Sequence, residues 1–91
     1  MMTPQFDRER LPQALEYFTH RAGLRLIGRG PWRSALCCFH DERNPSLRIN
    51  VETGAYRCMA CGARGGDLVD FHRARHGLSF RAALADLGVP Q

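Results

Sequence analysis

The sequence contains no lysine, and all thirteen of its basic residues are arginine. It also lacks any apolar stretch near the roughly 20 residues that a transmembrane helix needs, which excludes a helical membrane protein. The first ten residues carry no apolar segment of the secretory-signal type, so we expect a cytoplasmic protein. No linker, internal repeat or low-complexity tract divides the chain, and we therefore expect a single domain over residues 1–91.

The length of 91 residues limits what the chain can do. It is too short for a catalytic domain with its own scaffold, and a core of this size is usually marginal without a structural metal. A zinc site can contribute about 10–16 kcal/mol to folding, which exceeds the total stability of about 5–15 kcal/mol of a typical domain. The formal net charge of +4 favours a nucleic acid over an acidic partner.

Four metal-ligand residues occur as two pairs, Cys37-x2-His40 and Cys58-x2-Cys61, separated by seventeen residues. Each pair can direct two side chains toward one ion, and two such pairs match the tetrahedral coordination of Zn²⁺. The intervening segment is long enough for a hairpin that brings the pairs face to face. In a cytosolic protein a zinc-thiolate site is favoured over two disulfides. We interpret the pattern as a zinc ribbon with one structural ion.

Two other ligand sets remain open at this point. Cys38 could replace His40, although adjacent side chains of an extended loop point in opposite directions. Alternatively, Cys58 and Cys61 could bind zinc with His72 and His76, because Cys-x2-Cys followed by His-x3-His on a helix resembles a DNA-reading finger. The gap of ten residues in that set is short for such a finger, and the set would leave Cys37 without a role.

Periodicity and turn residues predict an α+β fold, a small antiparallel sheet around the zinc site with flanking helices. The first helix covers about 11–22, with Leu11, Ala14, Leu15 and Phe18 at helical spacing. The zinc-binding core covers about 32–66, and helices that begin after Asp67 and Ser79 cover about 67–88. Within this arrangement we expect strands at 24–27, 32–37, 47–51 and 55–58.

Two sequence elements resemble the zinc-binding domain of bacterial (DnaG-type) DNA primases. The first is Cys37-Cys-Phe-His-Asp-Glu-Arg-Asn-Pro-Ser-Leu47, similar to C-P-F-H-x-E-x-x-P-S-F in that family. The second is Cys58-Met-Ala-Cys-Gly-Ala-Arg-Gly-Gly-Asp-Leu-Val-Asp-Phe71, similar to C-F-x-C-G-x-x-G-D-x-I-x-F. The resemblance implies zinc held by Cys37, His40, Cys58 and Cys61. Cys38, Leu47 and Met59 depart from the family pattern, and the last two replace aromatic rings.

The resemblance also implies a role in DNA replication, as a module that engages single-stranded template DNA where primer synthesis begins. In such primases the chemistry belongs to a separate polymerase domain. The nine acidic residues here are scattered rather than clustered, so we do not expect this chain to be an enzyme on its own. A primase catalytic domain or a replicative helicase would be its protein partner, and we expect a monomer.

Alternation along residues 47–51 directs Arg48 away from the core, and Arg57 lies on the partner strand of the predicted hairpin. An exposed sheet with arginine and a flat ring suits single-stranded nucleic acid. The candidate nucleic-acid contacts are Arg29, Trp32, Arg33, Arg48, Arg57 and Arg64. A solvated arginine face with Trp32 packed against the first helix is the simpler alternative.

Two further hypotheses concern other functions. The ribbon could dock a replication or transcription enzyme as a protein-interaction module, with no nucleic acid involved. Cys38 could instead form a redox switch with a neighbouring zinc ligand, which predicts that oxidation ejects the metal.

Overall fold

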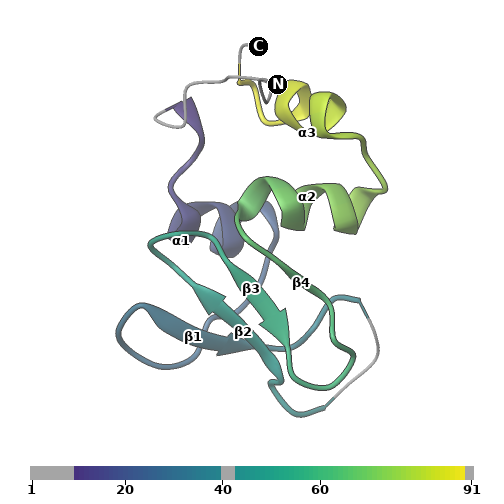
Figure 1. Ribbon diagram of the computed structural model, residues 1–91. Helices are drawn as coiled ribbons and strands as arrows, with labels where there is room; N and C mark the ends of the chain where they lie inside the picture. Colours follow the sequence, from purple (N-terminus) through teal and green to yellow (C-terminus); the bar gives the residue numbers. More distant parts are fainter. Residues whose placement is uncertain (1–9, 40–42, 90–91) are drawn as a thin grey trace.

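The computed structural model describes residues 10–39 and 43–89, and it combines a four-stranded sheet with a set of short helices (Figure 1). Each strand is antiparallel to the next, in the order β1-β2-β3-β4. The strands are β1 (Trp32–Ala35), β2 (Leu47–Asn50), β3 (Tyr56–Cys58) and β4 (Arg64–Gly65). The predicted class, a small antiparallel sheet flanked by helices, is confirmed.

The first helical segment consists of α1 (Ala14–Glu16), which continues directly into a π-helical turn, η2 (Tyr17–Arg21). It begins later than predicted because Gln13 still has an extended backbone, with φ −64° and ψ 140°. The buried face of this segment consists of Ala14, Tyr17 and Phe18, at ordinary helical spacing. Leu15 is 41% exposed, whereas Tyr17 is only 2% exposed. Leu15, which shares the helical spacing of Ala14 and Phe18, therefore lies largely outside the core.

The two carboxy-terminal helices, α2 (Leu68–His76) and α3 (Phe80–Asp86), begin at the predicted caps. The Asp67 carboxylate accepts a hydrogen bond from the Asp70 amide at 2.9 Å. The Ser79 hydroxyl accepts one from the Ala82 amide at 3.1 Å. These bonds satisfy amide groups that the first turn of a helix leaves without partners, which explains why both starts were readable in the sequence.

Antiparallel register separates the side chains of the sheet into two faces. Ile49 is directly opposite Tyr56, and Leu47 is opposite Cys58; all four side chains are buried. Between these pairs Arg48 is opposite Arg57, and both are exposed. Because side chains alternate along a strand, the buried pairs form an inner face and the arginines lie on an outer face. This alternation agrees with the prediction for residues 47–51.

The core is organised around Phe71 of α2, which is fully buried. Its ring lies 4.9 Å from Phe18 of η2, 5.0 Å from Tyr56 of β3 and 5.4 Å from Phe39, as measured between ring centroids. Edge-to-face contacts of this kind contribute beyond the area that they bury. One ring thus joins the helical layer, the sheet and the loop that follows β1.

Two strand predictions need correction. Residues 24–27 form no strand and contribute a single bridge, between Ile27 and Ser34. The Leu24 amide instead donates to the Phe18 carbonyl and ends the helix. Conversely, no strand was predicted at residues 64–65, where the structure forms β4. A Cβ atom at Gly65 would lie 2.5 Å from a ring carbon of Tyr56, so only glycine lets β4 pair at this position.

No helix of the described residues is long and apolar enough to cross a bilayer.

Candidate metal centre and basic face

The topology of the sheet brings the two cysteine loops to the same place. In an antiparallel meander β1 and β3 run in the same direction, so both strands terminate at the same end of the sheet. Cys37 follows β1 by two residues, and Cys58 is the last residue of β3. Cys61 belongs to the turn that leads from β3 into β4. The hairpin therefore delivers both loops to one end of the sheet, as the sequence predicted.

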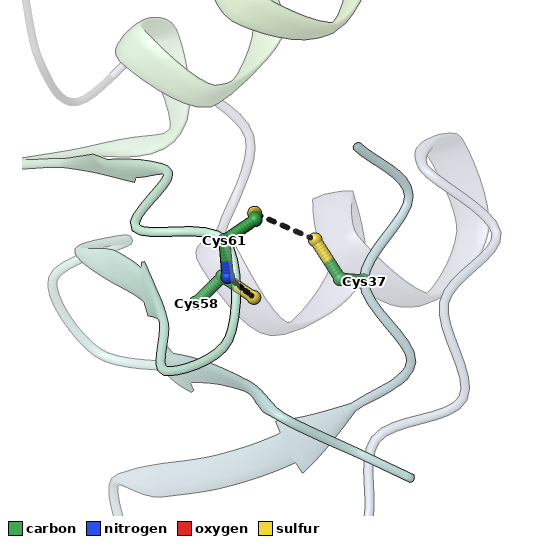
Figure 2. Close-up of side chains that lie close together, drawn as sticks. All are labelled: Cys37, Cys58 and Cys61. Atoms are coloured by element: carbon green, nitrogen blue, oxygen red, sulfur yellow. Dashed lines mark hydrogen bonds between the residues drawn. The ribbon is translucent and has the colours of Figure 1, made fainter. Parts of the chain in front are cut away.

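The sulfur atoms of Cys37, Cys58 and Cys61 all lie within 4.8 Å of one another (Figure 2). The Cys37 and Cys61 sulfurs are 3.9 Å apart. Tetrahedral Zn²⁺ with Zn–S bonds of about 2.3 Å requires sulfurs separated by about 3.8 Å. The Cys37–Cys61 separation thus matches that of two zinc ligands, and all three thiols lie close enough together to converge on one ion.

The loops also provide hydrogen bonds that favour sulfur in its ionised form. The Phe39 amide donates to the Cys37 sulfur at 3.4 Å, and the Cys61 amide donates to the Cys58 sulfur at 3.4 Å. The Ser46 hydroxyl lies 3.4 Å from the Cys58 sulfur as well. Such donors around a metal ligand orient it and stabilise its charge.

The pKa values of two neighbouring thiols in the cluster are shifted in opposite directions. Burial raises the pKa of Cys58, but hydrogen bonds from the Cys61 amide and from Ser46 outweigh burial and lower it to about 6. Burial and the neighbouring thiols raise the pKa of Cys37 to about 12. Neighbouring negative charges repel one another, so all three sulfurs cannot ionise together unaided. A divalent cation removes this conflict, and the residues fit Zn²⁺.

The structure separates the competing ligand sets in part. His40 lies outside the described residues. Cys38 is exposed and does not belong to the cluster of three sulfurs. His72 is fully buried, and both of its ring nitrogens already have partners. A finger that uses His72 as a zinc ligand is therefore wrong.

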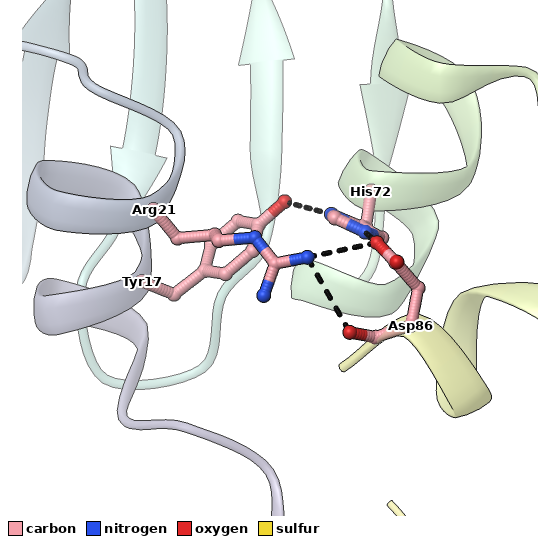
Figure 3. A network of polar contacts seen from close by, with 4 residues as sticks. All are labelled: Tyr17, Arg21, His72 and Asp86. Atoms are coloured by element: carbon pink, nitrogen blue, oxygen red, sulfur yellow. Dashed lines mark hydrogen bonds and ion pairs between the residues drawn. The ribbon is translucent and has the colours of Figure 1, made fainter. Parts of the chain in front are cut away.

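His72 is the centre of a network that joins all three helical segments (Figure 3). Its Nε2 lies 2.6 Å from the Asp86 carboxylate, and its Nδ1 lies 2.7 Å from the Tyr17 hydroxyl. Because a carboxylate only accepts, Nε2 carries the proton, and in a neutral ring Nδ1 accepts from Tyr17. Arg21 binds the same Asp86 oxygen at 2.8 Å. This role of His72 was not predicted, because its partners are distant in the chain.

Three of the candidate nucleic-acid residues form one row across the sheet. Arg48 on β2 is opposite Arg57 on β3, and Arg57 is opposite Arg64 on β4. Partners in register share a face, so the three guanidinium groups project from the outer face together. Among the described residues, none of the three has an acidic side chain in salt-bridge range. We call these three residues the arginine row.

The other candidates are distributed around the row. Trp32 lies on the same outer face, because it is two residues before Ser34, which is opposite Arg48. It is 44% exposed, so the alternative of a Trp32 packed against the first helix is wrong. Arg33 points to the other side of β1, and its Nε donates to the Gly30 carbonyl at 3.1 Å. Arg29 is exposed in the turn before β1.

Comparison with known proteins identifies relatives that carry the same elements. The chain is 40% identical to a DNA primase of Lactococcus lactis over 52 residues, which cover 57% of this chain and 8% of that protein. It is 43% identical to a DNA primase of Thermotoga maritima over 53 residues, or 58% of this chain and 9% of that protein. The Gene 58 protein of Mycobacterium phage D29 is 34% identical over 53 residues, covering 58% of this chain and 40% of that protein.

The shared segment thus makes up only 8% of the Lactococcus lactis primase and 9% of the Thermotoga maritima primase. The fold is similar to that of the Aquifex aeolicus primase (zinc binding and RNA polymerase domains), with a TM-score of 0.69 and 20% identity. That match covers 88% of this chain and 20% of the solved one. The pattern of the CHC2 zinc finger family, a zinc ribbon of DnaG type, matches residues 16–89. With its sulfur cluster spaced for zinc, this chain belongs to the CHC2 zinc finger family.

Proposed function

We propose that this chain is a zinc-dependent module that binds single-stranded DNA and supports primer synthesis in DNA replication, without polymerising nucleotides itself. The observation that carries the proposal is the arginine row beside the exposed ring of Trp32. The DNA primases among the relatives support the replication context. A primase catalytic domain or a replicative helicase remains the predicted partner, and the monomeric state remains a prediction.

The metal site would have a structural role in this function. Cys37, Cys58 and Cys61 supply three ligands in our proposal, and His40 supplies the fourth. When bound, zinc neutralises the thiolates and holds the ends of β1 and β3 together. Arg57 directly precedes Cys58, so the middle of the arginine row depends on the geometry of the metal loop.

The basic face suits a single strand more than a duplex. Neighbouring strands are about 4.8 Å apart, so three arginines in register span roughly 10 Å across the sheet. A flexible phosphate backbone can follow this row, while a base stacks on Trp32 at the β1 edge. Contacts of these two kinds carry little base-pair information, and we therefore expect a weak sequence preference from these residues.

The test is a fluorescence-anisotropy titration of zinc-loaded protein with a labelled single-stranded oligonucleotide, at several salt concentrations. The double variant Arg48→Ala with Arg57→Ala should weaken binding at least about tenfold, and it should reduce the salt slope by about 1.4, or about 0.7 for each lost phosphate contact. The matched control is Arg73→Ala with Arg81→Ala on α2 and α3, which removes the same charge from the helical layer.

The two variants separate a located site from general electrostatic attraction. Equal losses in both double variants would mean that only net charge matters, and the assignment of the outer face would be wrong. The zinc content of each variant is measured as well. A variant that still binds zinc is folded, so its weaker DNA binding reflects lost protein–DNA contacts. Substitution of Trp32 by alanine should weaken binding with little change in the salt slope, because stacking releases no counterions.

A further inference from the structure

A groove of about 400 Å³ lies at the β1 edge of the sheet, beside the first metal loop, since its lining residue Leu36 directly precedes Cys37. One wall comes from the segment between η2 and β1, and the other comes from the residue after β1 and from the residues just before β2. Its apolar lining residues are Leu24, Ile27, Leu36 and Pro45. We call this feature the edge groove.

The edge groove gathers large apolar side chains that face solvent. Ile27 is 49% exposed and Leu36 is 50% exposed. Ile27 is opposite Ser34, and Leu36 follows Ser34 by two residues, so alternation puts both side chains on the same face. Isolated exposed apolar residues are common, but two that line one groove are typical of an interaction surface.

Both charged residues that line this groove in the described part of the chain are arginines. Arg25 and Arg43 line it, both are exposed, and its lining includes no acidic residue among those described. Neither guanidinium has an acidic partner within the described part of the chain. An occupant with negative charges beside apolar groups would match both the lining and its rim.

The backbone at this edge can also accept an extended partner. Ile27 and Ser34 exchange two hydrogen bonds, of 2.7 and 2.9 Å, and pairing stops after this single bridge. In the parts of the chain described here, the backbone groups of Arg25 and Leu36 make no hydrogen bond with another backbone group. Unpaired groups at a sheet edge are the usual template for an added strand.

From these observations we propose that the edge groove binds an extended peptide of a partner protein that carries both apolar and acidic residues. Its apolar side chains would pack on Ile27 and Leu36, and its carboxylates would pair with Arg25 and Arg43, which line the same groove. The inference goes beyond nucleic-acid binding and does not depend on the arginine row.

The experiment uses the zinc-loaded chain and a fluorescein-labelled peptide in which Asp alternates with Leu. Leu36→Ser should weaken binding about fivefold, because half of a leucine side chain loses its apolar contact. Leu15→Ser is the matched control, since Leu15 is also exposed but lies on the first helix. Arg25→Ala with Arg43→Ala should weaken binding about three- to tenfold, whereas Arg57→Ala with Arg64→Ala, on strands farther from the groove, should change it less than twofold.

Peptide controls test the two halves of the proposed chemistry. A peptide of Asp alternating with Ser, and one of Lys alternating with Leu, should each bind at least about tenfold more weakly. Equal binding of the Asp-Ser peptide, or equal losses in the control variants, would overturn the inference in favour of a general electrostatic effect. Displacement of the peptide by unlabelled oligodeoxythymidine would also overturn it, because the groove would then be part of the nucleic-acid site. Failure of DNA binding with the peptide retained would refute only the proposed function.

Discussion

Gly54 provides a sharp test of how the sheet is joined to α2. It lies in the turn between β2 and β3, it is buried, and its φ is +84°. A Cβ atom at this position would lie 2.7 Å from the backbone nitrogen of Leu68, the first residue of α2. Since a backbone atom cannot rotate away as a side chain can, Gly54→Ala must displace either the turn or the start of the helix.

The expected loss can be built from two contributions. An L-residue in the left-handed region costs about 1–2 kcal/mol, and forcing extra volume into a packed site costs about 1–3 kcal/mol. Alanine also lowers the entropy of the unfolded chain, which returns about 0.4–1 kcal/mol. We therefore expect Gly54→Ala to lower the free energy of unfolding by about 2–4 kcal/mol, a large share of the stability of a domain of this size.

Gly23 is the matched control because it shares the backbone conformation but not the contact. Its φ is +72°, and a Cβ atom there would meet nothing within 4 Å. Gly23→Ala should therefore lower the free energy of unfolding by only about 1 kcal/mol.

The assay is urea unfolding followed by circular dichroism, at one fixed concentration of free zinc for every sample. With a urea m-value of about 1–3 kcal/mol/M, the two variants should differ in midpoint by roughly 0.5–2 M. Midpoints that agree within experimental error would refute the reasoning, because they would mean that the contact with Leu68 has no energetic consequence.

Two further predictions concern the metal loops and the tyrosines. Cys58→Ser should lose bound zinc and the circular dichroism spectrum of the folded protein, whereas Cys38→Ser should keep both. The measurement is a chelator-based zinc assay on each variant. Equal zinc retention in the two variants would contradict the ligand assignment. Burial raises the pKa of both tyrosines, that of Tyr17 to about 12, so the fold favours the neutral phenol. This stabilisation is complete below the unfolded pKa of about 10 and is lost as the pH rises through about 12. Absorbance at about 295 nm should therefore show less tyrosinate at pH 10 in the folded protein than in the urea-unfolded chain. A folded midpoint near that of the unfolded chain would contradict the burial.

Much of the fold could be predicted because its signals are local. Asp67 and Ser79 mark helix starts, since each cap binds an amide only three residues away. The alternation of residues 47–51 identified the two faces of the sheet. The spacing of the cysteine pairs predicted a cluster that the topology indeed brings together, although its fourth ligand remains a prediction.

The features that were missed depend on contacts between distant residues. Tyr17 and His72 are 55 positions apart, and only the packed helices bring the hydroxyl to the ring. The π turn of η2 was not predicted either, because the spacing of apolar residues does not distinguish a π turn from a regular α-helix. β4 was missed because Gly65 is usually a sign of a loop, whereas here it makes room for the ring of Tyr56.

The arginine row has a consequence for the free protein. Like charges in register on neighbouring strands repel one another, so Arg48, Arg57 and Arg64 push apart the strands that carry them. The outer face therefore lowers the stability of the fold as long as no anion lies on it. Any polyanion that settles on the row relieves this repulsion and stabilises the sheet. Occupancy of the face and rigidity of the domain should accordingly rise together.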